Sequence, residues 1–256
     1  MHSLFVHDHG TGPPLVLIHG FCETSEIWNS FIKPLTNHYR VIRPDLPGFG
    51  NSAPQPGRIT IDQVAEALAG WLRQSDIPPA MVLGHSLGGY ITLALAEQHP
   101  HLLRGFGLFH STCFADTEEK KANRNRIIEF VKRNGVLPFV ETFVPGLFHD
   151  KDHPAIPGVH DIASGTRAET LIQYADAMRD RPDRTRVLEK SNLPNLIIAG
   201  REDAAVPVVD SRKMAKLGQK STYFELEEVA HMGFIEAPEE CRVIATSFTD
   251  RLFPPN

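Results

Sequence analysis

Apolar and polar positions along this 256-residue chain follow two different periods. Short continuous apolar runs end at Gly, Pro, Asn or Asp, which is typical of strands buried on both faces of a parallel sheet. Between these runs, apolar residues recur every three or four positions and predict helices. The predicted strands are residues 4–6, 15–18, 40–44, 81–84, 102–109, 195–200 and 222–226. The alternation predicts an α/β fold, with a mostly parallel central sheet of about seven strands flanked by helices.

Helical spacing is clearest in three segments outside the middle of the chain. One helix is expected from Thr24 or Ser25 to about Asn37, because either hydroxyl can cap it and apolar residues follow on one face. A second is expected at 59–74 and a third at 238–252.

The pattern changes between residues 113 and 188. Charges cluster at 116–126, Pro and Gly interrupt the chain repeatedly, and no run resembles a strand. We expect a helical lid (cap) inserted into an α/β core made of residues 1–112 and 189–256. Apolar lid residues either pack the lid onto the core or line a substrate pocket, since both use the same residue types. The pocket interpretation selects Phe139, Phe143, Leu147, Phe148, Leu171 and Met178.

Composition narrows the classes of partner. The net charge is −5, with 41% hydrophobic and 22% charged residues, which is ordinary for a soluble globular protein and argues against nucleic acid. The chain has no basic segment followed by an apolar leader core, and no apolar run of membrane-spanning length. We expect a cytoplasmic monomer or homodimer that binds a small-molecule substrate and not a membrane.

Cysteine and histidine spacing gives no sign of a metal site or a cofactor. The three cysteines are odd in number and lack ligand spacing, so free thiols are expected and neither a disulfide framework nor a zinc site is indicated. Histidines 149, 153 and 160 lie among aspartates, but their spacing is irregular. We expect no metal and no cofactor.

The strongest motif lies where the run 81–84 breaks at glycines and resumes with helical spacing. Gly84-His-Ser-Leu-Gly88 fits the pattern G-x-S-x-G, in which a serine occupies a strained corner between a strand and a helix. Such a corner lifts the hydroxyl above the sheet edge and points a helix N-terminus at it. We therefore predict that Ser86 is a nucleophile and that the amide of Leu87 stabilises an oxyanion.

A second glycine-containing segment follows the strand 15–18. In His19-Gly20-Phe21 the glycine lets the backbone turn, so that the amide of Phe21 is predicted to be the second oxyanion donor. Cys22 comes next, and its thiol is expected near the pocket, either as an inert buried group or as a point of sensitivity to thiol reagents. Asp45, after the strand 40–44, is interpreted as a structural carboxylate that accepts nearby backbone donors.

Two later loops supply an acid and a base. Asp203 follows the strand 195–200 at the position where parallel α/β sheets carry functional groups, and adjacent Glu202 is the alternative acid. His231 follows the last strand in a loop, where a histidine can lie between an acid and a hydroxyl.

The order Ser86, Asp203, His231 resembles the α/β-hydrolase superfamily, and the resemblance covers nearly the whole chain. It extends through His19-Gly20-Phe21, the loop 45–52, the elbow 84–89, Gly200-Arg-Glu-Asp203 and the segment 231–238. Compared with that family, one of the two N-terminal strands is missing, so seven strands are expected rather than eight. Serine at the elbow, where other branches have aspartate, sets the dehalogenase and epoxide-hydrolase branches aside.

The resemblance implies a serine hydrolase that acts through an acyl-enzyme on a small to medium, mainly apolar ester or related acyl substrate. Ser86 is then the nucleophile, His231 the base and Asp203 the acid, with the amides of Phe21 and Leu87 as the oxyanion hole. A lactonase, a thioesterase, a carbon–carbon bond hydrolase and a cofactor-free perhydrolase remain alternatives on the same triad. A ligand receptor that keeps the fold remains an alternative of another class.

Overall fold

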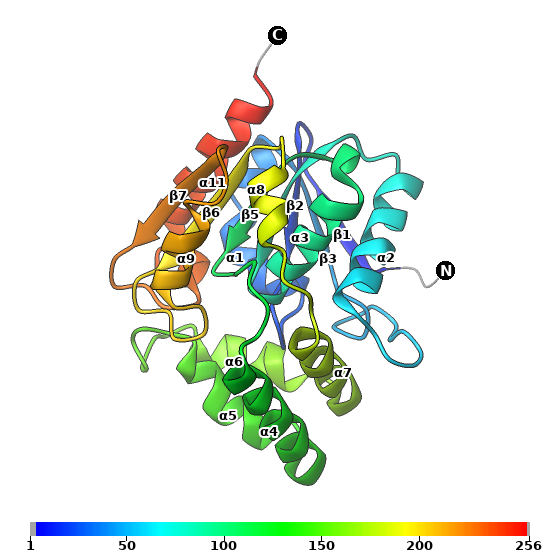
Figure 1. The fold of residues 1–256 in the computed structure, drawn as a ribbon, viewed down its shortest axis with the longest axis vertical. Helices are drawn as coiled ribbons and strands as arrows, with labels where there is room; N and C mark the ends of the chain where they lie inside the picture. Colours follow the sequence, from blue (N-terminus) through cyan, green and yellow to red (C-terminus); the bar gives the residue numbers. More distant parts are fainter. Residues whose placement is uncertain (1–3, 255–256) are drawn as a thin grey trace.

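A seven-stranded sheet runs through the centre of the molecule in the computed structural model, which describes residues 4–254 (Figure 1). The strand order is β1-β3-β2-β4-β5-β6-β7; β1 is antiparallel to β3, and every other pair is parallel. The predicted fold class is confirmed. The strands are β1 (Val6–His9), β2 (Pro14–Ile18), β3 (Arg40–Pro44), β4 (Ala80–His85), β5 (Leu103–Phe109), β6 (Asn195–Gly200) and β7 (Ser221–Leu226).

Helices cover both faces of the middle strands. Every residue of β2, β4 and β6 is buried, and because successive side chains point to opposite faces, both faces must be covered. The helices α2 (Ile61–Gln74) and α3 (Leu87–Gln98) pack on each other, and α3 lies on β4 and β5. The C-terminal helix α11 (Pro238–Leu252) also packs against β5, and α9 (Val208–Met214) against β6.

Register brings the carboxyl ends of four strands to one edge. Gly84 pairs with Ile18 of β2, and His85 pairs with Phe109 of β5. Phe109 also pairs with Ile198 of β6. The loops that follow β2, β4, β5 and β6 therefore begin side by side, although they are far apart in the sequence.

Five helices occupy the chain between β5 and β6. In Figure 1 the first four, α4 to α7, gather at one end of the sheet, and α8 leads back to β6. Within this layer α4 packs on α7, and α5 packs on α6. The lid boundaries 113–188 stay a prediction. The five helices are α4 (Glu118–Asn134), α5 (Leu137–Gly146), α6 (Ile156–Ser164), α7 (Ala168–Arg179) and α8 (Thr185–Lys190).

The structure corrects two local predictions and adds one helix. The first strand is Val6–His9 rather than 4–6, because antiparallel pairing with β3 extends it through polar residues at the sheet edge. The helix expected up to Asn37 is broken into 3₁₀ and α segments, with α1 only at Asn29–Ile32, since Pro34 has no N–H for the helical ladder. The helix α6 was not expected, although a proline in its first turn is compatible with a helix start.

The short helix α10 (Gly233–Glu236) completes the set between β7 and α11. Across residues 4–254, none of the helices combines the length and hydropathy that crossing a membrane would require.

Candidate active site

The turn between β4 and α3 is built from glycines that touch backbone. A Cβ on Gly84 would lie 2.2 Å from the carbonyl oxygen of Gly88, and a Cβ on Gly88 would lie 2.4 Å from the carbonyl oxygen of Ile18. Neither contact leaves room for a side chain. Between them Ser86 adopts φ 49° and ψ −113°, a left-handed conformation that a non-glycine residue rarely holds. The predicted strained corner is therefore present.

Ser86 is the accessible residue of this corner. From Ala80 to Ala96 every other residue is buried, whereas Ser86 is half-exposed. Its backbone is fixed on both sides: its N–H donates to the carbonyl of Phe109 at 2.9 Å, and its carbonyl accepts from the Ser111 hydroxyl at 2.7 Å. The side chain is thus offered to the space above the sheet while the main chain is held.

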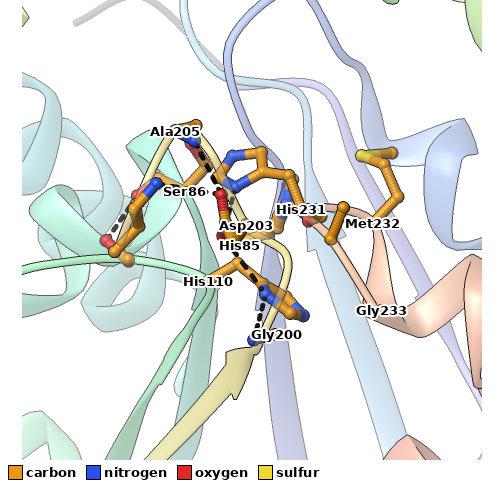
Figure 2. A network of polar contacts seen from close by, with 12 residues as sticks. His85, Ser86, His110, Gly200, Asp203, Ala205, His231, Met232 and Gly233 are labelled. Carbon is orange, nitrogen blue, oxygen red and sulfur yellow. Dashed lines mark hydrogen bonds and ion pairs between the residues drawn. The ribbon is translucent and has the colours of Figure 1, made fainter. Parts of the chain in front are cut away.

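Asp203 and His231 form a buried hydrogen-bonded pair beside this corner (Figure 2). The distance from Asp203 Oδ2 to His231 Nδ1 is 2.8 Å, and the side chains are 1% and 6% exposed. Asp203 Oδ1 accepts from the N–H groups of Ala205 and Val206 at 2.8 and 2.9 Å, which fixes the carboxylate. Because the Asp203 carboxylate accepts the hydrogen bond, the ring proton of neutral His231 lies on Nδ1, and Nε2 is free to accept a proton.

Electrostatics favour an ionised Asp203 and a protonated His231 in this pair. Burial by itself would raise the pKa of Asp203, but the charges and hydrogen bonds of His231 and His110 outweigh burial and hold that pKa far below its usual value. Burial would lower the pKa of His231, but Asp203 outweighs it and raises that pKa. Glu202 is exposed, so the alternative acid does not face the site.

His85 places the loop of His231 against the elbow. Its Nε2 lies 2.9 Å from the carbonyl oxygen of His231, and the two rings are 4.9 Å apart between centroids. Since Ser86 is the next residue, the chain that carries the imidazole runs directly beside the serine. Figure 2 shows Ser86, Asp203 and His231 gathered above the strand ends, with His85 and His110 below them.

The loop after β2 lies against the first turn of α3. Its position follows from Gly88, which packs on the carbonyl oxygens of Ile18 and His19. The amide of Gly20 donates to Glu23 Oε2 at 2.6 Å, which leaves Phe21 as the next amide of the loop. Leu87 is the first residue of α3, and the assignment of its amide and that of Phe21 as oxyanion donors stays a prediction.

Three predicted lid residues meet the loops of the site. The rings of Phe139 and Phe143 stack at 4.9 Å, and each contacts the ring of Phe21, at 6.4 and 6.0 Å. The carbonyl oxygen of Leu147 accepts from the N–H of His231 at 2.9 Å. This bond links the helical layer to the backbone of His231.

The other three predicted lid residues are buried. Phe148 stacks on His153 at 5.2 Å. Leu171 and Met178, 0% and 1% exposed, lie in α7, which packs on α4. Their pocket role stays a prediction.

Three buried ionisable residues of the site were not singled out from the sequence: Glu23, His85 and His110. His110 follows β5, so the rule that selected Asp203, a polar residue directly after a predicted strand, also selects it. Its Nδ1 lies 3.4 Å from Asp203 Oδ2 and 3.2 Å from the N–H of Gly200. Burial outweighs the neighbouring carboxylate and lowers the pKa of His110 to about 4. The same rule selects His85, which directly follows the run 81–84, whereas Glu23 carries no comparable signal.

The interpretations of Asp45 and Cys22 have different outcomes. Asp45 accepts from the N–H groups of Ser25 and Asn51, both at 2.8 Å, so its structural role is confirmed. Cys22 is 1% exposed, and burial raises the pKa of its thiol. A thiol that is neither accessible nor ionised gives no support to the expected reagent sensitivity.

Comparison with known proteins agrees with this geometry. A family model described as the alpha/beta hydrolase fold matches residues 13–121. A thermophilic esterase from Thermogutta terrifontis has 30% sequence identity and a TM-score of 0.92, over 97% of this chain and 93% of that one. The pimeloyl-acyl-carrier-protein methyl ester esterase of Aeromonas hydrophila is 29% identical, over 93% of this chain and 96% of that protein. The 3-oxoadipate enol-lactonase 2 of Acinetobacter baylyi is 27% identical, over 89% and 85%.

The sheet, the glycine-bounded elbow and the relatives place this chain among hydrolases of the α/β class. The chain belongs to the α/β-hydrolase family.

Proposed function

We propose that this chain is a serine hydrolase that cleaves small to medium, mainly apolar esters or related acyl compounds through an acyl-enzyme. The observation that carries the proposal is the buried 2.8 Å hydrogen bond between Asp203 and His231, beside a half-exposed serine held at φ 49°. A positioned carboxylate, an imidazole with a free Nε2 and an accessible hydroxyl are the parts that nucleophilic acyl transfer requires. The esterase names of the relatives support the same reaction class.

In the proposed mechanism Ser86 Oγ attacks the acyl carbonyl while His231 Nε2 accepts the hydroxyl proton. The carbonyl oxygen becomes an anion, which the amides of Phe21 and Leu87 and the N-terminus of α3 stabilise. Collapse breaks the bond to the leaving oxygen, which takes the proton from His231 and departs as the alcohol. A water molecule then attacks the acyl-enzyme by the same route, releases the acid and restores Ser86. Asp203 keeps the imidazole in the correct tautomer throughout.

The helical segment 113–188 is proposed to act as a lid that sets substrate size. Contacts with the loops of the site support this role, because Phe139 and Phe143 lie on Phe21 and Leu147 holds the backbone of His231. An aromatic cluster above the oxyanion loop favours an apolar acyl or alcohol group. Phe148, Leu171 and Met178 complete the proposed set of pocket residues.

Lactone hydrolysis is the second candidate. A lactone is a cyclic ester, so the same triad and oxyanion hole can open it, and the similarity to an enol-lactonase favours testing it.

The test is a substrate screen with p-nitrophenyl esters of increasing acyl length and a set of lactones. We expect repeated turnover with a maximum at short to medium chains. A preference for long emulsified triglycerides would contradict the size limit. A single slow turnover would instead indicate a ligand receptor that keeps the fold.

A further inference from the structure

A buried carboxylate, Glu23, pairs with a buried histidine, His85, the residue before Ser86, and neither has a part in the proposed triad. Glu23 and His85 have side chains that are 2% and 1% exposed. The distance from His85 Nδ1 is 3.1 Å to each oxygen of the Glu23 carboxylate. Oε2 of Glu23 also accepts from the N–H of Gly20 at 2.6 Å, and the other ring nitrogen of His85 lies 2.9 Å from the carbonyl oxygen of His231.

The hydrogen-bond partners determine how many protons this pair carries. A backbone carbonyl only accepts, so His85 Nε2 must be the donor to His231. Oε2 of Glu23 accepts from the N–H of Gly20, and a deprotonated carboxylate has no proton to donate. A hydrogen bond between Glu23 and His85 Nδ1 therefore needs a proton between these two groups. Without that proton two lone pairs would face each other at 3.1 Å in a buried site, which is costly.

We propose that Glu23 and His85 form a buried carboxylate–imidazolium pair whose residues position the two halves of the active site. Glu23 holds the loop of Gly20 and Phe21, and His85 holds the backbone of His231 from the other side. The catalytic consequence rests on the proposed function, whereas the protonation of the pair does not.

The surroundings of His85 favour a closed pair over a solvated one. A Cβ on Gly20 would lie 2.7 Å from His85 Nδ1, so the loop leaves little space beside the ring. The titratable groups that face His85 are Glu23, His231 with ring centroids 4.9 Å apart, and His110 at 6.3 Å. His19 also interacts with His85: burial lowers the pKa of His19, and the charge of His85 acts in the same direction. Trp28 and Phe234 cover the remaining sides of the ring.

The imidazolium of His85 also neutralises the negative charge of Glu23. A lone carboxylate behind the oxyanion hole would oppose the negative charge that develops on the substrate, and the imidazolium neutralises it. In agreement, burial would raise the pKa of Glu23, but the charge and hydrogen bond of His85 and the amide of Gly20 outweigh burial and lower that pKa.

The charge state is tested on the resting enzyme by ¹⁵N NMR of the histidine rings, with His85→Asn to assign the signals. We expect both ring nitrogens of His85 to be protonated at neutral pH in the wild type, and only Nε2 in Glu23→Gln. A wild-type ring with an unprotonated Nδ1 would overturn the carboxylate–imidazolium pair, whatever reaction the protein catalyses.

The positioning role is tested by steady-state kinetics of Glu23→Ala, Glu23→Gln and a control, Glu26→Ala, which removes an exposed charge from the same segment. Removal of one oxyanion donor lowers kcat by about 10²- to 10³-fold in a well-studied protease. Misplacement of the Phe21 amide in Glu23→Ala should therefore lower kcat by about 10- to 100-fold and leave KM within about twofold of the wild-type value. Gln should restore most of kcat, because its oxygen can accept from Gly20 and its amide can donate to His85. Glu26→Ala should match the wild type.

Three results separate the two proposals. Equal kcat in the wild type and Glu23→Ala would overturn positioning and leave the hydrolase proposal intact. Equal losses in Ala and Gln would also overturn positioning, because the carboxylate charge alone would then explain them. Absence of ester turnover in the wild type, with no labelling of Ser86 by a phosphonate ester, would reject the hydrolase proposal, and the NMR result would still decide the charge state.

Discussion

Ser86 owes its position to backbone constraint rather than to its own side-chain contacts. Glycines on both sides accept no Cβ, and the N–H and carbonyl of Ser86 are bonded to Phe109 and Ser111. Substitution of the side chain at this position should therefore change the chemistry and leave the fold.

Ser86→Ala should abolish ester hydrolysis. In a serine protease, loss of the nucleophile costs roughly six orders of magnitude in kcat, and the remaining catalysis over water is about 10³- to 10⁴-fold. Initial rates on a p-nitrophenyl ester measure the loss, and the circular-dichroism melting curve should match the wild type. Wild-type turnover by the variant would remove Ser86 from the mechanism.

Asp203→Asn should reduce kcat by about four orders of magnitude, because the amide favours the wrong imidazole tautomer. His231 must be neutral to act as the base. Burial would lower its pKa, but Asp203 outweighs burial and raises that pKa above 6.5. Wild-type activity should therefore fall as the pH drops through the raised pKa. Without the charge of Asp203, the acid limb of the pH–rate profile should move to lower pH.

Glu202→Gln is the matched control for Asp203→Asn, since this neighbouring carboxylate is exposed. Its profile and rate should follow the wild type. A larger loss in Glu202→Gln than in Asp203→Asn would move the acid by one residue.

At the scale of elements, glycines differ in what their surroundings allow. Gly70 lies inside α2, where the nearest neighbour of an added Cβ is the Arg73 guanidinium at 4.0 Å, so Gly70→Ala should fit. Removing a helix-interior glycine should raise the free energy of unfolding by about 0.5–1 kcal/mol, measured by urea denaturation. Gly88→Ala should destabilise the protein instead, because its Cβ would meet Ile18 backbone at 2.4 Å. Equal effects at the two positions would contradict this account of the elbow.

The helix α5 reaches the loop of Gly20 and Phe21 through Phe143, which is half-buried and contacts both Phe21 and Phe139. Phe143→Ala should enlarge the proposed pocket, so the preferred acyl chain should lengthen. The kcat/KM ratio between medium and short p-nitrophenyl esters measures this, and each substrate methylene that the enlarged pocket accepts should shift it by about 10- to 200-fold at most. Phe130→Ala, on an exposed position of α4, is the control and should leave the ratio unchanged.

At the scale of the whole molecule, buried histidines couple stability to pH. His110 has its pKa lowered from 6.5 to about 4 by burial, so the unfolded chain takes up a proton before the folded protein does. Stability should therefore fall as the pH drops from about 6.5 toward 4, by at most about 1.4 kcal/mol per pH unit. The lowered pKa of Asp203 adds a loss at still lower pH. The raised pKa of His231 has the opposite sign, since its contribution is lost as the pH rises through that value.

Urea denaturation of the wild type and of His110→Gln at about pH 7 and about pH 4.5 tests this coupling. The variant should lose less stability between the two pH values than the wild type does. An equal loss in both proteins would mean that His110 does not titrate as its burial requires.

The sequence by itself determined the strand pattern and the order of the candidate triad. Continuous apolar runs between turn residues mark buried parallel strands, and residues that follow such runs must meet at one edge of the sheet. That rule reached Ser86, Asp203 and His231, and it also reaches His110. Local signals were weaker where the elements are short: Pro34 breaks a helix that apolar spacing favours, and pairing with β3 moved the first strand.

Only the tertiary structure decided which side chains of the loops and lid face one another. Glu202 and Asp203 are neighbours in sequence, and exposure of one and burial of the other separates them. Glu23 and His85 meet although their positions are 62 residues apart in the sequence. Their backbone partners are Gly20, in the loop of Glu23, and His231, in the loop after β7. Periodicity assigns a residue to a face of its own element and says nothing of such contacts, because each one depends on where every other element packs.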